Sequence, residues 1–241
     1  MILKTENLSF SYEDRLILNN INIEVKDGEF VSILGPSGCG KSTLLNVLAG
    51  ILPAGSGKVL LGDQEVKGIR HELAYMPQED LLFPWRTILD NVTLYGQIHK
   101  NKEEARKQAL AQFERFGLSG CEDKYPEELS GGMRQRAAFL RTSLCDASIY
   151  LLDEPFGALD VITRNDMQDW LLDMRAKLNH TIVLVTHDTD EAIYLSDRIF
   201  VFGQPGEGIR EEIAITEQNR SREWLYDQKD VRLKIHDIIK G

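Results

Sequence analysis

The sequence of 241 residues has few cysteines and fewer basic than acidic residues. Its three cysteines, Cys39, Cys121 and Cys145, are odd in number, lie far apart and show no metal-ligand spacing, so we expect reduced thiols rather than a disulfide framework. The 28 Lys and Arg against 38 Asp and Glu give a net charge of −10. This balance argues against a surface that binds nucleic acid directly.

The sequence also has no apolar run long enough to cross a bilayer. The longest charge-free stretch around its glycine-rich loop, residues 42–57, has 16 residues and contains Pro53 and three glycines, whereas a spanning helix needs about 20 mostly apolar residues. The opening MILKTENLSFSYEDR has neither an apolar core for export nor a cleavage site. We therefore expect a cytosolic protein that contacts a membrane only through a partner.

What the chain does contain is a glycine-rich loop, GPSGCGKST, at residues 35–43. Gly35, Gly40, Lys41 and Ser42 match the pattern G-x-x-x-x-G-K-[ST], in which glycines let backbone N–H groups surround an anion. An apolar run at 30–34 precedes the loop and a helix-like run follows it, so a turn that binds nothing is the weaker alternative. We predict that the loop holds the phosphates of a nucleoside triphosphate, with Lys41 on the β- and γ-phosphates and Ser42 on Mg²⁺.

The order of predicted elements indicates an α/β fold. Strand patterns alternate with helical ones, and a phosphate loop at the first strand-to-helix turn is typical of a parallel core. Residues 102–117 favour a helix that ends at Gly117, and residues 221–239 favour one amphipathic helix. The predicted strands are 2–12, 16–25, a pair within 58–66, 73–78, 148–154, 181–187, 198–202 and 209–215, with helices filling about 86–145.

Two apolar strands end in residues that suit catalysis. The run IYLLDE at 149–154 ends in Asp153 and Glu154, and TIVLVTH at 181–187 ends in His187. Carboxyl ends of parallel strands meet at the edge where ligands bind. One carboxylate could hold Mg²⁺ while the other orients a water, and His187 could bond the γ-phosphate. The alternatives are a solvated strand-terminal turn and a surface histidine.

The run LSGGMRQRAAFLR at 129–141 predicts a second phosphate contact at a helix start. Ser130 can cap a helix that begins near Met133, and Gly131 and Gly132 allow close approach to an anion. An ordinary capped surface helix is the alternative. One nucleotide hardly needs two such sites from one chain, so a second copy of the protein could supply this one.

Together these segments, in this order, resemble the ATP-binding subunit of ABC transporters, from about residue 2 to about 215. Residues 35–43 correspond to Walker A, Gln78 to the Q-loop, 129–133 to the signature, 149–154 to Walker B, 157–160 to the D-loop and His187 to the H-loop. The resemblance implies ATP and Mg²⁺ as cofactors and two subunits that close on two ATP molecules.

The resemblance also implies a role for each site residue. Tyr12 would stack on adenine, although a surface tyrosine is a real competitor. Glu154 would be the general base, Gln78 would sense Mg²⁺ and the γ-phosphate, Asp153 would hold Mg²⁺ and Asp160 would couple two sites. The phosphates would be held by Gly35, Pro36, Ser37, Gly38, Cys39, Gly40, Lys41, Ser42 and Thr43 in one subunit and by Ser130, Gly131 and Gly132 of the other; Cys39 itself is best read as a small filler.

The implied fold is a P-loop NTPase core with a parallel central sheet, an N-terminal antiparallel β subdomain and an α-helical subdomain inserted at about 86–145. The ATP-binding domain would span 1–215 and a helical tail 216–241. Transmembrane permease subunits would dock around Gln78 to Thr87 at the cytoplasmic face of the membrane, with an extracytoplasmic solute-binding protein as an indirect partner and no nucleic acid.

Within the family, the segments SGGMRQR, DEPFGALD and FPWRTILDNV look most like importers of nitrate, sulfonate, taurine and thiamine precursors. Met133 stands where the family commonly has Gln. Phe83 and Trp85 could face a partner's coupling helix or simply pack in the core. A scaffold ATPase for iron–sulfur assembly or cell division, a soluble ATPase acting on DNA or the ribosome, and an exporter or lipoprotein-extraction subunit are the alternatives.

Overall fold

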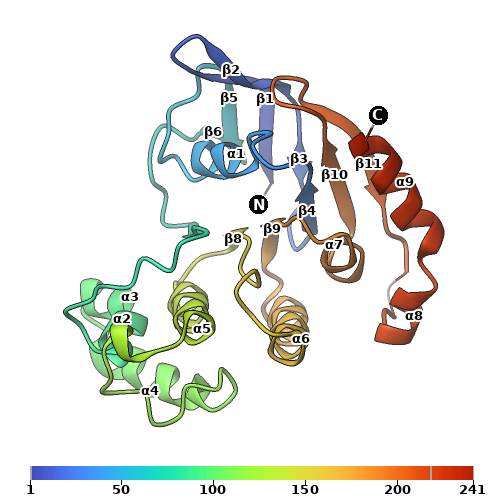
Figure 1. Cartoon of the computed structure of the whole chain (residues 1–241). Helices are drawn as coiled ribbons and strands as arrows, with labels where there is room; N and C mark the ends of the chain where they lie inside the picture. The colour runs from blue at the N-terminus through green and yellow to red at the C-terminus, as the bar shows by residue number, and fades with distance from the viewer. Residues whose placement is uncertain (1, 218, 241) are drawn as a thin grey trace.

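The computed structural model describes residues 2–217 and 219–240, whose strands form two sheets (Figure 1). The first is antiparallel, in the order β2-β1-β5-β6, with β3 also paired to β1. The second has the order β11-β10-β4-β9-β8-β7, and every pair in it except β10–β11 is parallel. The strands are β1 (Leu3–Tyr12), β2 (Arg15–Ile21), β3 (Glu24–Val25), β4 (Phe30–Leu34), β5 (Ser56–Leu61), β6 (Gln64–Glu65), β7 (Leu73–Met76), β8 (Ile149–Asp153), β9 (Thr181–Val185), β10 (Arg198–Phe202) and β11 (Ile209–Ala214).

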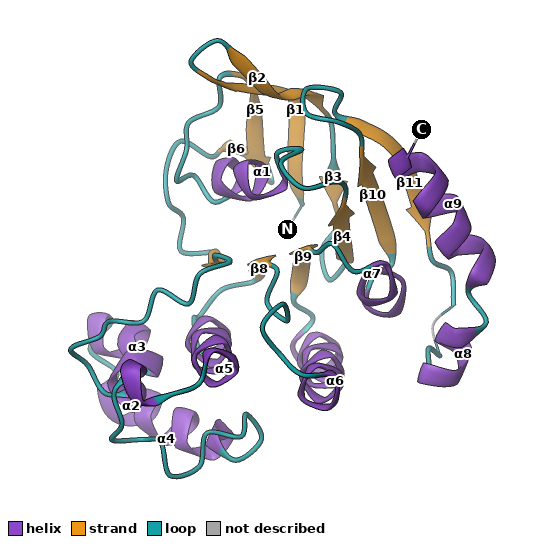
Figure 2. Cartoon of the chain, viewed as in Figure 1, coloured by secondary structure: helices purple, strands orange, loops and turns teal. Residues whose placement is uncertain are grey.

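Helices cover the larger sheet on both sides (Figure 2). No helix within the described ranges is both long and apolar enough to cross a membrane. Four helices, α2 to α5, lie between β7 and β8 in the chain, apart from the antiparallel sheet. The helices are α1 (Lys41–Leu48), α2 (Ile88–Val92), α3 (Leu94–Ile98), α4 (Lys102–Phe113), α5 (Gly131–Ser143), α6 (Val161–Leu178), α7 (Thr189–Leu195), α8 (Arg222–Tyr226) and α9 (Lys229–Lys240), with a 3₁₀ turn at Pro126–Glu128.

Strands β4, β8 and β9 are buried along their whole length, which explains why they read as continuous apolar runs. Successive residues of a strand point to opposite faces. Leu151 and Val183 accordingly pack with α1 and the antiparallel sheet, whereas Leu152 and Leu184 pack with α5, α6 and α7. The predicted α/β core with a parallel sheet, an antiparallel N-terminal sheet and inserted helices is confirmed.

Some predicted boundaries differ from the structure. The helix expected at 102–117 ends at Phe113, and Gly117, with φ +59°, makes a turn after it in which its N–H bonds to Glu114 O at 2.9 Å. The strand expected at 16–25 is divided into β2 and β3. Thr5 Oγ1 causes the division, because it donates to Ile21 O at 2.8 Å and accepts from Ile23 N at 3.0 Å in place of the strand ladder.

The helix expected at 221–239 is two helices, α8 and α9. At the junction Asp227 N bonds to Trp224 O at 3.2 Å and Gln228 N to Leu225 O at 3.1 Å. These bonds span three residues rather than four, so the first helix tightens and stops. The break lets Leu225 on α8 and Ile235 on α9 both join the core beneath α7 and β10.

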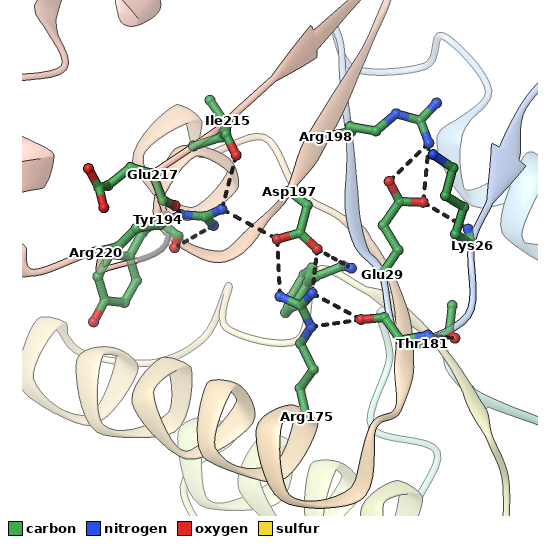
Figure 3. A network of polar contacts seen from close by, with 12 residues as sticks. Lys26, Glu29, Arg175, Thr181, Tyr194, Asp197, Arg198, Ile215, Glu217 and Arg220 are labelled. Carbon is green, nitrogen blue, oxygen red and sulfur yellow. Dashed lines mark hydrogen bonds and ion pairs between the residues drawn. The ribbon is translucent and has the colours of Figure 1, made fainter.

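A hub of polar contacts attaches the C-terminal segment to the parallel sheet (Figure 3). The Asp197 carboxylate, just before β10, accepts from Phe30 N at 3.0 Å, Arg175 Nη1 at 3.2 Å and Arg220 Nη2 at 3.4 Å. Arg220 also donates to Tyr194 O on α7 at 3.2 Å. One carboxylate thus joins the start of β4, the end of α6 and the segment before α8.

Candidate nucleotide-binding site

The site begins where β4 ends and α1 begins. Gly38 and Gly40, with φ of +77° and +105°, turn the chain tightly between them, and a Cβ on Gly40 would lie 2.8 Å from Ile17 Cγ2. Both positions therefore favour glycine. Cys39 is buried, and burial raises the pKa of its thiol, as suits the filler predicted for it.

Lys41 lies across the loop it follows. Its side chain is buried, and Nζ donates to Gly35 O at 2.9 Å and to Pro36 O at 3.0 Å. The ammonium group is thereby held over the concave side of the loop, beside the N-terminus of α1. A fixed cation at a helix N-terminus, next to a glycine turn, is suited to bind an anion such as phosphate.

A cavity of about 410 Å³ opens on this loop. Its lining joins the phosphate loop to β2 and to the ends of β7 and β8, so residues distant in the sequence share one space. The lining residues are Arg15, Ile17, Ser37, Gly38, Gly40, Lys41, Ser42, Thr43, Gln78 and Glu154. A larger hollow of about 940 Å³ lies between α3, α4 and α6, and none of the predicted site residues lines it.

Asp153 is a buried carboxylate at the end of β8. It is 2% exposed, and within the described chain its Oδ1 has no hydrogen-bond partner. Burial raises the pKa of Asp153, while the Ser42 hydroxyl and the charge of Lys41 act in the opposite direction. A buried oxygen left without a donor, beside a serine hydroxyl, matches the hard oxygen ligands that Mg²⁺ takes. The residues present therefore fit the expected magnesium site.

Glu154, Gln78 and His187 meet at the same edge of the sheet. Glu154 Oε2 accepts from Gln78 Nε2 at 3.1 Å and lies 3.3 Å from His187 Nδ1. Glu154 has φ +48°, a left-handed conformation that costs energy in a non-glycine residue, and its N–H is held by Val185 O at 2.9 Å. The structure thus brings Gln78 together with Glu154 and His187, the two residues that the sequence places at one edge of the sheet.

The second predicted phosphate contact lies elsewhere on the chain. Ser130 caps α5 by accepting from Met133 N at 3.3 Å, and Asp160 caps α6 by accepting from Thr163 N at 3.1 Å. A Cβ on Gly132 would lie 3.1 Å from Ala158 O, so the start of α5 packs against the segment before Asp160. Ser130, Gly131, Gly132 and Asp160 do not line the cavity of their own chain.

Comparison with known proteins identifies this arrangement. Residues 18–157 match the model of the family described as ABC transporter. The chain belongs to that family. It is an ABC-type ATP-binding subunit, a class of ATPase, as the resemblance implied.

Relatives and solved structures agree with the family. The formylaminopyrimidine import ATP-binding protein ThiZ of Halalkalibacterium halodurans is 45% identical over 100% of this chain and 95% of its own length. The aliphatic sulfonates import ATP-binding protein SsuB of Bacillus licheniformis is 42% identical over 79% of this chain and 74% of its own. The dimeric ABC transporter cassette MJ0796 superposes with a TM-score of 0.82 at 31% identity, over 90% of this chain and 100% of its own. The dimeric structure of its post-hydrolysis state, bound to ADP and Pi, superposes with a TM-score of 0.80 at 30% identity, again over 90% of this chain and 100% of its own.

Tyr12 and the residues that follow it lie differently with respect to the cavity. Tyr12 is 50% exposed, with its ring centroid 4.9 Å from that of Phe10, and it does not line the cavity. Arg15 and Ile17 of β2 do line it, and neither was predicted. The available signal was their place a few residues after Tyr12, with Ile17 inside the strand predicted at 16–25 and Arg15 directly before it.

The segment after Gln78 presents apolar side chains on the surface of the cassette. Trp85 is 71% exposed and Leu81 is 57% exposed, whereas Phe83 is half-buried with its ring centroid 5.2 Å from that of Trp85. Asn91 fixes the segment by accepting from Phe83 N at 2.7 Å and donating to Phe83 O at 3.1 Å. Core packing, the alternative considered for both aromatic residues, is therefore wrong for Trp85.

Proposed function

We propose that this chain is the ATP-hydrolysing subunit of an importer of a small solute. The observation that carries the proposal is the meeting of Gln78, Glu154 and His187 beside the phosphate loop. The similar proteins ThiZ and SsuB are both import ATP-binding proteins, which favours import over export. The ATP-binding domain would span 1–215, its helical subdomain about 86–145, and the tail 216–241.

In this proposal the loop from Gly35 to Thr43 binds the phosphates of ATP through its N–H groups and the Lys41 ammonium. Ser42 and Asp153 would hold Mg²⁺, together with Gln78, which lines the same cavity as Ser42, and the bound cation would neutralise phosphate charge. Glu154 accepts a hydrogen bond from the attacking water and orients it toward the γ-phosphorus. His187, beside Glu154, donates to the γ-phosphate, and Tyr12 stacks on the adenine.

A second copy of the chain completes each site in this proposal. Ser130, Gly131 and Gly132 offer a capped helix start whose N–H groups can meet the γ-phosphate on the opposite subunit. Their absence from the cavity of their own chain supports a contact between subunits. Asp160 would then lie between the two sites and couple them.

The membrane partner would dock on the segment from Gln78 to Thr87. Exposed Leu81 and Trp85 supply apolar surface there, and this surface begins three residues after Gln78. A permease bound at this point would place the chain at the cytoplasmic face of the membrane, with a solute-binding protein on the other side of the permease. A change in the position of Gln78 would then be transmitted to the permease through only a few residues.

Affinity purification of the tagged chain from detergent-solubilised membranes of its host, followed by mass spectrometry, tests this proposal. We expect a polytopic membrane protein and a secreted binding protein in the eluate. Trp85→Glu should reduce their recovery at least ten-fold, because a charge in an apolar interface costs more than about 1.4 kcal/mol. Tyr226→Glu, at a 78% exposed position on α8, is the matched control and should not. Recovery of soluble partners alone would instead favour a scaffold ATPase.

A further inference from the structure

Arg164, on the first turn of α6, contacts two loops at once. Its Nη2 donates to Leu159 O at 3.1 Å, and its backbone N–H bonds to Asp160 O at 2.8 Å. On its other side Nη1 lies 3.6 Å from Asp188 Oδ2 and Nε lies 3.7 Å from Glu191 Oε1. One guanidinium group thus joins the segment that ends at Asp160 to the start of α7.

The residues on either side of His187 are held by the same group of contacts. Thr186 Oγ1 donates to Glu191 Oε2 at 2.6 Å and accepts from Asp188 N at 3.0 Å. Asp188 Oδ1 caps α7 by accepting from Asp190 N at 2.8 Å. The His187 side chain is 64% exposed and lies beside Glu154, and the backbone that carries it is bordered on both sides by residues that these contacts hold.

Arg164 contacts the segment before α6 more closely than it contacts the start of α7. Its bond to Leu159 O is within hydrogen-bond distance, whereas its approaches to Asp188 and Glu191 are ion pairs longer than a hydrogen bond. Its Nε is buried and, in the part of the chain that the structure describes, has no hydrogen-bond partner. Glu191 is itself only 6% exposed, so the attraction between the two charges is weakly screened. A shift of residues 157–160 would therefore change how firmly Arg164 holds the start of α7.

We propose that Arg164 is a positioning residue for ATP hydrolysis. Arg164 transmits the position of residues 157–160 to His187 through Asp188 and Glu191. The inference rests on the proposed function, in which His187 contacts the γ-phosphate. Arg164 itself does not line the nucleotide cavity, so it acts through other residues.

Steady-state ATP hydrolysis by the purified chain, together with ATP affinity, tests this role. Arg164→Ala should lower kcat roughly ten-fold, as expected for a misplaced catalytic group, and change the Kd for ATP less than about two-fold. Arg164→Lys keeps the charge and one donor group, so it should recover part of kcat. Glu191→Gln, which keeps an oxygen acceptor for Thr186, should lower kcat like Arg164→Ala. The control is Asp173→Asn, an exposed α6 carboxylate paired with Arg115, and it should leave kcat unchanged.

A double-mutant cycle with His187→Ala separates positioning from a general loss of structure. If Arg164 acts through His187, adding Arg164→Ala to His187→Ala should lower kcat by no more than about two-fold. Independent, multiplying losses, or a wild-type kcat in Arg164→Ala, would overturn the inference and leave the proposed function standing. Failure of His187→Ala to lower kcat would instead remove the proposed role of His187, and the inference with it.

Discussion

At the scale of single residues, the site contains groups that lower the stability of the folded protein when no ligand is bound. Asp153 lies buried with an unpartnered oxygen, and Glu154 holds a left-handed backbone conformation. Both costs fall at the end of β8, where Mg²⁺ and water would be held in the proposed function. Strain and unpaired polar groups persist only where the surrounding structure enforces them, and they concentrate at functional sites.

Asp153→Asn tests the cost of the buried carboxylate. Burial places the pKa of Asp153 in the folded chain above its unfolded value near 3.8. The protonated carboxyl is the form that the folded chain favours. Its stabilising effect is fully present below that unfolded value and is lost as the pH rises through the folded pKa. In EDTA at neutral pH the free energy of unfolding of the variant should therefore be about 1 kcal/mol higher than that of the wild type. Its Tm should be higher by about 2–4 °C.

The gap in Tm between Asp153→Asn and wild type should close as the pH falls toward 4. Differential scanning calorimetry across this range measures it. A variant that melts below the wild type at neutral pH, without metal, would contradict the assigned cost. With Mg²⁺ and ATP the order should reverse, because only the wild type gains the metal-linked stabilisation.

At the scale of elements, the position of α6 and α7 depends on contacts made at both of their ends. The N-terminus of α6 carries Asp160, and that of α7 carries Asp188, which directly follows His187. The far ends of both helices converge on the hub around Asp197 (Figure 3). The tail adds Arg222, which bonds Asp169 at 2.8 Å and lies 3.9 Å from the Tyr194 ring centroid. The tail, for which the sequence suggested no role, therefore contacts both helices that lead to the site.

Asp197→Asn tests the hub. The change removes the charge between Arg175 and Arg220 and leaves Arg220, 8% exposed, near another cation. Removing one partner from a partly buried ion-pair network should cost about 2–3 kcal/mol, and thermal melting should show a loss of several degrees. Asp173→Asn, on the exposed side of α6, is the control and should change Tm by less than about 1 °C. Equal melting of the two variants would contradict the role of the hub.

At the scale of the whole molecule, the two predicted phosphate contacts lie on separate parts of one chain. In the proposed function a second copy of the chain brings the two contacts together, and the similar cassette MJ0796 is dimeric. Glu154→Gln keeps the shape of the side chain but removes the proposed base. We expect it to bind Mg-ATP, to lose hydrolysis by at least about 100-fold, and to accumulate as a dimer.

Multi-angle light scattering of Glu154→Gln measures that dimer. The mass should approach twice 27.4 kDa with Mg-ATP and remain near 27.4 kDa with ADP, which is the control. A monomer in both conditions would count against closure of two copies on ATP in the absence of a permease.

The residue order by itself determined the chemistry of the site and the class of the fold. Glycines at 35 and 40, Lys41 and the apolar runs before Asp153, Glu154 and His187 are local patterns, and local patterns reflect backbone sterics and burial. They were enough to predict a parallel core and a nucleotide loop. The boundary between β2 and β3 was missed because Thr5, a side chain distant in sequence, decides it.

Only the tertiary structure decided which residues meet. The strand order β4-β9-β8-β7 places the ends of β7, β8 and β9 side by side, so that Gln78, Glu154 and His187 come within 3.1 and 3.3 Å. It also put Arg15 and Ile17, rather than Tyr12, on the cavity. No local pattern encodes such pairings, because they arise from packing between segments far apart in the chain.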